Sequence, residues 1–267
     1  TGFFNTLSVR NALARRHSWT EVGILIDIHS LSISGLHDTP ALRQLIQYFL
    51  TVKIPFRWVF SEQAIPKPVR TLVAWSTTAL SRQTLGKLTA FADQPGHQVV
   101  LSETTGRFDE WYLRHDDALF RNWRAHPRFV ILPGNRVSKG REAAGIASIL
   151  DDKKPLDPLN RETLDPFFQS DAFQPRMRFV LPDPVAVHTE INEEGALLVH
   201  LRDYSGSGRV LEGARAILCG ASGYCAEGRF YAPDSVECPV ASTPVEKGRE
   251  FLLPPFRHYG LLILPKE

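Results

Sequence analysis

The sequence predicts an α/β domain built on a mainly parallel sheet, followed by a smaller antiparallel β domain. Short continuous apolar runs alternate with segments of helical apolar spacing up to about residue 150. After Arg176 the apolar period becomes two, which is typical of antiparallel strands with one buried face. The length of 267 residues is comfortable for two hydrophobic cores.

The strands of the first domain are predicted from runs that are apolar throughout, as expected for a parallel sheet covered by helices on both faces. The opening run is Val22–Ile26, and further runs cover residues 56–60, 70–75, 97–101 and 128–132. Helices are predicted over 39–52, after Ser81, and over 116–125. Thr39 and Pro40 form a typical helix start, with a cap residue before a proline at the first helical position.

Four segments follow from these patterns. Residues 1–20 are predicted to form an entering helix that ends near His17 and Ser18. Residues 21–150 form the α/β domain. Residues 151–176, rich in Asp and Pro, are expected to be a linker with a short helix near 160–168. Residues 177–267 form an antiparallel β-sandwich, with strands at 185–191, 196–201 and 258–264 and recurrent Gly turns.

Composition excludes several classes of partner and compartment. The net charge is +2 and no Lys/Arg block occurs, so we expect no nucleic acid and no membrane as partner. The start shows no signal-peptide order and no initiator Met, which suggests a longer or processed protein. Three cysteines, Cys219, Cys225 and Cys238, fit free thiols better than one disulfide between the first two. A cytoplasmic location is therefore expected.

Acidic residues gather on loops at predicted strand ends, where α/β domains place ligands. Paired carboxylates there could act as acid and base or bind a cation, but a solvated loop and an acidic helix start stabilised by the helix dipole explain them better. The residues are Glu103, Asp109, Glu110, His115, Asp116 and Asp117. If this domain has a substrate-binding site, we expect it at Arg107, Asp109, Glu110 and Trp111. No metal, cofactor or catalytic residue is predicted.

Other candidates fit a structural role better. Ser76 follows a predicted strand but lacks a Gly-x-Ser-x-Gly motif, so it is expected to cap a helix. His29 and His37 flank a predicted surface loop that lacks a phosphate-binding glycine motif. All five tryptophans are assigned to the first domain. They are Trp19, Trp58, Trp75, Trp111 and Trp123. Sugar stacking by the β domain would therefore depend on Tyr204, Tyr224, Tyr231 and Tyr259, of which Tyr204 and Tyr259 read as core or corner residues.

Several stretches resemble the non-barrel part of bacterial beta-galactosidases whose catalytic domain is a TIM barrel. In the first domain the matching stretches are Val22–Ile26, residues 71–96 and residues 104–110. They resemble the class I glutamine-amidotransferase-like trimerisation domain, which has a flavodoxin-like sheet. In the second domain they are residues 199–204, Val-His-Leu-Arg-Asp-Tyr, and residues 253–259, Leu-Pro-Pro-Phe-Arg-His-Tyr. These resemble the small β domain that closes many such enzymes.

The resemblance implies an accessory role. In that family two catalytic glutamates lie at the ends of barrel strands, and no barrel fits before residue 20. The expected function is a non-catalytic structural and oligomerisation portion of a glycoside hydrolase. Its partners would be a TIM barrel of the same or a neighbouring chain and further copies in a homo-oligomer, with a carbohydrate as possible ligand. The alternatives are a free-standing carbohydrate-binding or sensing module, and a small hydrolase using Asp109 and Glu110.

Overall fold

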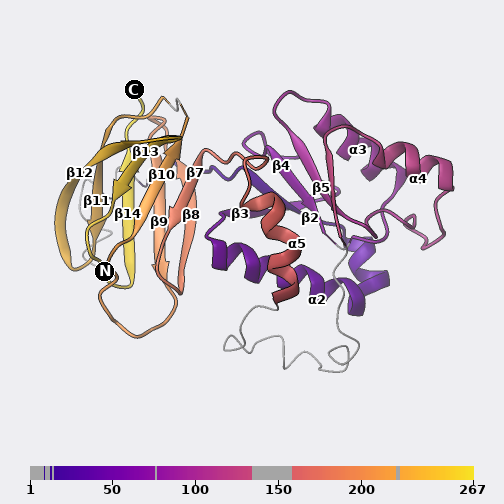
Figure 1. Cartoon of the computed structure of the whole chain (residues 1–267), viewed down its shortest axis with the longest axis horizontal. Coiled ribbons are helices and arrows are strands. Elements are labelled where there is room, and N and C mark those ends of the chain that lie inside the picture. The colour runs from indigo at the N-terminus through magenta and orange to yellow at the C-terminus, as the bar shows by residue number, and fades with distance from the viewer. Residues whose placement is uncertain (1–8, 10–12, 14, 76, 134–157, 221–222) are drawn as a thin grey trace. The chain divides into compact units, whose positions relative to one another are not determined.

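The computed structural model describes residues 9, 13, 15–75, 77–133, 158–220 and 223–267. The chain forms two compact units (Figure 1). The α/β unit comprises Glu21–Tyr48 and Phe56–Phe173, and the antiparallel unit comprises Thr1–Thr20, Phe49–Pro55 and Gln174–Glu267. The two classes of sheet that the sequence predicts are both present, in the predicted order along the chain.

The α/β unit is built on five parallel strands. They are β2 (Val22–Ile26), β3 (Phe56–Phe60), β4 (Thr71–Ala74), β5 (Gln98–Ser102) and β6 (Phe129–Leu132). Their order in the sheet is β3-β2-β4-β5-β6, with parallel pairing throughout. The strand order therefore reverses between β2 and β4, and in doubly wound sheets ligands bind beyond the carboxyl ends at such a point.

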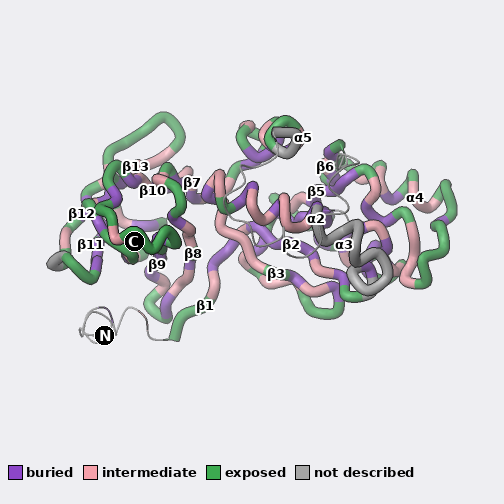
Figure 2. Tube along the Cα trace, turned by 90° about the horizontal axis from the view of Figure 1, so that it is seen from below, coloured by how far each residue is buried: buried purple, intermediate pink, exposed green. Residues whose placement is uncertain are grey.

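Apolar side chains cover both faces of this sheet. Leu72 and Leu101 face one side, where they pack with Leu88 of α3 (Arg82–Ala92). Val73 and Val100 point to the opposite side and are also fully buried. The other helices are α2 (Ile28–Val52), of which residues 28–48 belong to this unit, α4 (Asp117–Arg124) and α5 (Pro158–Phe168). Figure 2 shows the burial along the strands and the exposure of the connecting loops. The continuous apolar runs are explained by this two-sided cover.

The start of α2 corrects the sequence prediction. The helix begins at Ile28, directly after β2, and not at Thr39. The Asp27 carboxylate accepts a hydrogen bond from the Ser30 amide at 2.8 Å, which caps the new helix end. His29 and His37 therefore lie within a helix, and the predicted surface loop between them does not form.

The segment predicted as a linker carries a packed helix. Helix α5 matches the predicted helix, and its Leu164, Phe167 and Phe168 are buried. The Tyr48 hydroxyl of α2 donates to the Asp165 carboxylate at 2.7 Å, and burial raises the pKa of Tyr48. Residues 151–157 lie outside the described residues. Helix α5 thus belongs to the α/β unit rather than to a solvated connection.

The antiparallel unit contains one nine-stranded sheet. Its strands are β1 (His17–Ser18), β7 (Met177–Val180), β8 (Val185–Ile191), β9 (Leu197–Asp203), β10 (Arg215–Cys219), β11 (Glu227–Ala232), β12 (Ser235–Val245), β13 (Gly248–Leu252) and β14 (Tyr259–Leu264). The order is β1-β8-β9-β14-β11-β12-β13-β10-β7. Strand β12 pairs with β11 through its first half and with β13 through its second half. The sheet curls, so that Val199 of β9 and Phe251 of β13 share one core.

The beginning of the chain joins the antiparallel unit. Most of the predicted helix over 1–20 lies outside the described residues, but its end, His17–Ser18, is a strand paired with β8. Trp19 is buried in the core of this unit and meets Tyr224 edge-on at 6.5 Å. The assignment of all five tryptophans to the first domain is therefore wrong for Trp19. The local apolar pattern could not show that residues 17–18 pair with a strand about 170 residues later.

Candidate functional site

The loop that carries the predicted substrate-binding residues follows β5 at the carboxyl edge of the parallel sheet. The Thr105 hydroxyl donates to the Ala74 carbonyl at the end of β4 at 2.7 Å, and the Gly106 amide donates to the Thr77 carbonyl at 2.9 Å. Gly106 adopts φ +70°, and a Cβ there would lie 3.0 Å from the Trp123 ring. The base of the loop is therefore fixed to the neighbouring strand end.

The tip of this loop is a short hairpin closed by Asp109. One oxygen of the Asp109 carboxylate accepts from the Trp111 amide at 2.9 Å and from the Leu113 amide at 2.8 Å. The Leu113 carbonyl in turn accepts from the Asp109 amide at 2.8 Å. Such a side chain satisfies backbone donors that the turn leaves open. Asp109 thus fixes the shape of the tip.

The hairpin presents large apolar side chains to solvent. Trp111 is 77% exposed and Leu113 is 65% exposed. Tyr112 adopts φ +62° and stacks on Phe108 with ring centroids 4.4 Å apart. Exposed aromatic groups on a rigid support are typical of interaction sites. Arg107 is exposed and Glu110 is half-buried in the same loop. The structure therefore places the four predicted residues on one hairpin.

Three further residues of the predicted cluster have structural contacts, whereas Glu103 is exposed. Asp116 caps α4 by accepting from the Leu119 amide at 3.1 Å and the Ala118 amide at 2.8 Å, and these bonds lower the pKa of Asp116. Asp117 pairs with Arg114 at 2.9 Å. His115 is buried, with Nε2 2.9 Å from the Leu80 carbonyl. Within the described residues no group of three or more His, Cys, Asp or Glu is arranged to hold a metal ion.

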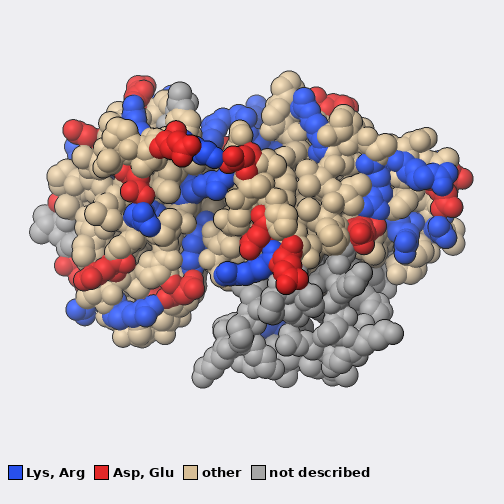
Figure 3. Space-filling view, in the orientation of Figure 1, with Lys and Arg blue, Asp and Glu red and all other residues tan. Residues whose placement is uncertain are grey.

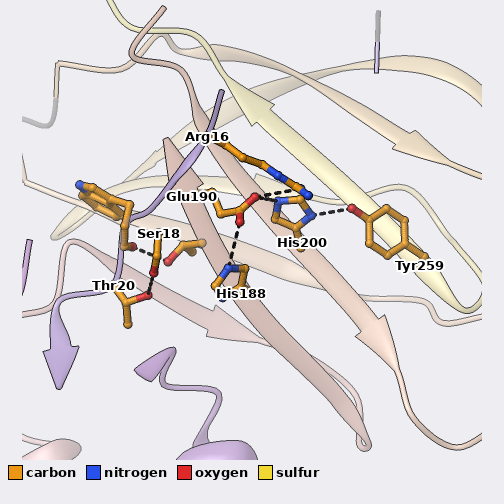
Figure 4. A network of polar contacts seen from close by, with 9 residues as sticks. Arg16, Ser18, Thr20, His188, Glu190, His200 and Tyr259 are labelled. Carbon is orange, nitrogen blue, oxygen red and sulfur yellow. Dashed lines mark hydrogen bonds and ion pairs between the residues drawn. The ribbon is translucent and has the colours of Figure 1, made fainter. Parts of the chain in front are cut away.

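A second polar cluster lies on the antiparallel unit and was missed by the sequence analysis (Figure 4). Glu190 of β8 is its centre. One carboxylate oxygen lies 3.0 Å from the Arg16 guanidinium and 3.0 Å from Nε2 of His200. The other lies 3.3 Å from Nε2 of His188. The Nδ1 atom of His200 lies 2.5 Å from the Tyr259 hydroxyl. Residues from three strands, β8, β9 and β14, and from the segment before β1 thus form one network around the Glu190 carboxylate.

Burial controls the ionisation of this cluster. It lowers the pKa of His200 to about 4, against the attraction of Glu190. It also raises the pKa of Tyr259 to about 12. His200 is therefore neutral at pH 7, and with Nδ1 accepting from Tyr259 its ring hydrogen lies on Nε2, facing Glu190. The charge of Glu190 is balanced by Arg16, which makes the cluster an anchor for the start of the chain.

In the sequence, this cluster is indicated by one polar residue, His200, in an otherwise apolar part of its strand. His200 stands between Val199 and Leu201, and both are fully buried. Strand alternation places His188, Glu190 and His200 on the face opposite the main core. The pattern indicates that these polar side chains need a polar partner on that face, but it does not indicate which residue of the sequence supplies that partner.

Several other predicted positions are also placed. Tyr224 and Tyr231 are buried. Tyr204 is 62% exposed, and the Arg202 guanidinium lies 5.0 Å from the centre of the Tyr204 ring, so of the two expected positions, core or corner, the core position is excluded. Tyr204 directly follows the last residue of β9. The three cysteines are half-buried free thiols. Ser76 lies outside the described residues. No helix within the described part of the chain has the length and apolar character needed to cross a bilayer.

Comparisons with known proteins identify related folds. No protein-family model and no curated protein sequence matches the chain. Among solved structures, the chain is similar to alpha-L-fucosidase isoenzyme 2 from Paenibacillus thiaminolyticus, with a TM-score of 0.58 and 13% identity over 97% of this chain and 51% of that one. It is also similar to a catalytic mutant of Gan42B, a GH42 beta-galactosidase from G. stearothermophilus, with a TM-score of 0.51 and 12% identity over 93% and 40%. The chain thus spans about half the length of the first and less of the second, and it shares its fold with parts of glycoside hydrolase chains.

Proposed function

We propose that this chain is a non-catalytic structural and oligomerisation portion of a carbohydrate-active enzyme of the beta-galactosidase type. One observation carries the proposal. Both units together, in this chain order, correspond to one part of a larger glycoside hydrolase chain over 97% of their length. The α/β unit would be the amidotransferase-like trimerisation domain, and the antiparallel unit the closing β-sandwich. A TIM barrel of the same or a neighbouring chain would supply the catalytic carboxylates.

The contacts of the best-placed carboxylates support this division of roles. Asp109 and Asp116 accept hydrogen bonds from backbone amides, which fixes a turn and a helix end. Asp117 is paired with Arg114, and Glu190 is surrounded by Arg16 and His200. A glycosidase of the usual type needs two carboxyl groups facing one glycosidic bond across a cleft. The roles of these four acids are those of a scaffold.

The hairpin around Asp109 would be the part of the α/β unit that contacts a sugar or a neighbouring subunit. The backbone of Trp111 is held in a closed turn and its side chain is exposed, so it can cover a sugar face or a neighbouring subunit without ordering of the backbone. We propose that Arg107, Asp109, Glu110 and Trp111 line part of a sugar cleft completed by the barrel, and that the assembly is a homo-oligomer. A preformed hairpin of this kind would shape the cleft without taking part in bond cleavage.

The catalytic part of the proposal is tested by assaying the purified chain with chromogenic galactosides and fucosides. We expect no turnover above buffer. Turnover that follows the chain through successive purification steps would overturn the non-catalytic assignment. As a second arm, the complete gene product is assayed in parallel, and there we expect hydrolysis.

The role of the hairpin is tested in the complete gene product with Trp111→Ala. We expect KM to rise about tenfold, or the oligomer to dissociate in size-exclusion chromatography, because one aromatic contact is removed. Trp58→Ala is the matched control, since Trp58 is a partly exposed tryptophan on β3 in the same unit. If the Trp111→Ala variant has the KM and the oligomeric state of the native protein, the hairpin has no role in substrate binding or assembly.

A further inference from the structure

A cavity of about 390 Å³ opens on the antiparallel unit. Three segments surround it: the loop at Val210, the β11–β12 turn with Asp234, and the segment before β14 with Phe256, Arg257 and His258. Sites for small molecules have volumes of about 300–1,000 Å³. The cavity therefore has the size of a site for one or two sugar rings.

The floor of the cavity is apolar and its wall is fixed. Ala232 and Phe256 are almost fully buried beneath it. Leu211 and Phe256 exchange two backbone hydrogen bonds, of 2.8 and 3.2 Å. The Phe256 ring packs against Phe230 with centroids 5.7 Å apart. A ligand would therefore meet a surface that is already in place before binding.

Two side chains around the cavity, those of Asp234 and Arg257, have no recorded contact with a polar group in the described part of the chain, and His258 has only an electrostatic attraction to the Asp203 carboxylate. The structure records no hydrogen bond or ion pair for the side chains of Asp234, Arg257 and His258 within the described residues, and all three are exposed. Nearby groups differ: Arg209 donates to the Asp183 carbonyl, and Asp203 accepts from the Ser205 hydroxyl at 2.7 Å. The free polar groups therefore coincide with the cavity lining.

The backbone at His258 is strained. This residue adopts φ +55°, and the Tyr259 amide donates to the Arg257 carbonyl across it. A three-residue turn of this kind is rare for a non-glycine residue and costs free energy. Glycine would adopt the same conformation without a side chain. A histidine at this point places two successive polar side chains, Arg257 and His258, on the cavity.

We propose that this cavity binds a neutral saccharide of one or two sugar units. Asp234 accepts hydrogen bonds, Arg257 donates them, and His258 can do either, which suits hydroxyl groups that both donate and accept. The lining carries one positive charge, on Arg257, and one negative charge, on Asp234, so it does not favour a polyanionic ligand. On the face seen in Figure 3, acidic and basic side chains of the antiparallel unit are interspersed rather than gathered by sign. The saccharide class rests on the proposed function, whereas the site itself rests on the cavity and its free groups.

The test is a titration of the full chain with galactose, fucose and lactose up to about 50 mM, followed by amide chemical shifts in NMR. We expect millimolar binding, with shifts concentrated at Val210, Asp234 and residues 255–258. Arg257→Gln and Asp234→Asn should each weaken binding about tenfold, because each removes one charge-assisted hydrogen bond. His258→Gly should weaken binding while leaving the melting temperature unchanged or higher, because glycine relieves the strain.

Arg229→Gln is the matched control, because Arg229 is an exposed arginine of the same unit paired with Glu237 at 3.0 Å, away from the cavity lining. It should bind as the native chain does. Absence of binding at the highest concentration, shifts located elsewhere, or equal affinity in native and Arg257→Gln proteins would overturn the site. Binding of citrate but of none of the sugars would overturn the saccharide class. None of these outcomes depends on hydrolase activity, so failure here is distinct from failure of the proposed function.

Discussion

The hairpin around Asp109 and the cluster around Glu190 use the same kind of group in opposite ways. Asp109 binds amides two and four residues further along the chain. Glu190 instead meets Arg16, about 170 residues earlier, and His200 on the adjacent strand. The first network is local and holds an exposed tryptophan, whereas the second is long-range and fixes the start of the chain. A carboxylate in a local turn shapes a surface, and a carboxylate between distant strands determines which segments meet.

The largest effect is expected from Glu190→Gln. Arg16 loses its charge partner and the neutral His200 loses a charged neighbour, but Arg16 is 42% exposed, so we expect a cost of about 2 kcal/mol, below that of a fully buried ion pair. Urea denaturation of the native and variant chains measures this difference. The control is Glu193→Gln, which removes the exposed pair with Arg15 and should cost less than about 1 kcal/mol. Similar costs for both variants would show that the cluster is not an anchor.

The next effect is a pH dependence from His200. Its folded pKa of about 4 lies below the unfolded value of 6.5, so the unfolded chain binds more protons between these two values. Stability therefore rises with pH from about 4 to 6.5, and is lost as the solution is acidified through that window. The contribution is roughly 2 kcal/mol across the window.

His200→Gln tests this assignment, because a neutral amide keeps a polar group but cannot titrate. The free energy of unfolding of the native chain and of the variant should be measured at several pH values between 4 and 7. We expect the difference between the two proteins to change across the window. A constant difference would mean that His200 does not titrate as its burial implies.

A smaller effect is expected from Asp109→Ala. Two amides at the hairpin tip lose their acceptor, but both are near solvent, so the cost should be about 1 kcal/mol. Hydrogen exchange at Trp111 and Leu113 should accelerate, which reports the local opening. Glu110→Gln serves as the control in the same loop and should leave exchange unchanged. Unchanged exchange in Asp109→Ala would contradict the closing role of this side chain.

The smallest effect on stability is expected from Trp111→Ala in the isolated chain. The side chain is 77% exposed, so the free energy of unfolding should change by less than about 0.5 kcal/mol. Thermal melting followed by circular dichroism measures this. A large loss of stability would mean that Trp111 is part of the packing, and the hairpin would no longer be a free contact surface.

The comparison also separates what could be predicted from what could not. Each predicted strand of the parallel sheet is present within two residues, because a strand buried on both faces is apolar throughout. The Ser81 cap of α3 was equally readable, and its hydroxyl accepts from the Thr84 amide at 3.0 Å. The start of α2 was misplaced, because the Thr39-Pro40 signal competed with the cap at Asp27. Arg107 to Trp111 share one loop because they are consecutive in sequence, and their role as a binding site stays a prediction.

The sequence by itself determined the two classes of sheet, their order, and the turn that carries Trp111, since these depend on local spacing and local hydrogen bonds. Tertiary structure decided that Trp19 enters the core of the antiparallel unit, that Glu190 meets Arg16 and His200, and that Asp234 and Arg257 line one cavity. The physical reason is that strand pairing joins residues of any separation along the chain. An apolar or charged residue shows that it needs a partner, but only the folded sheet selects which one.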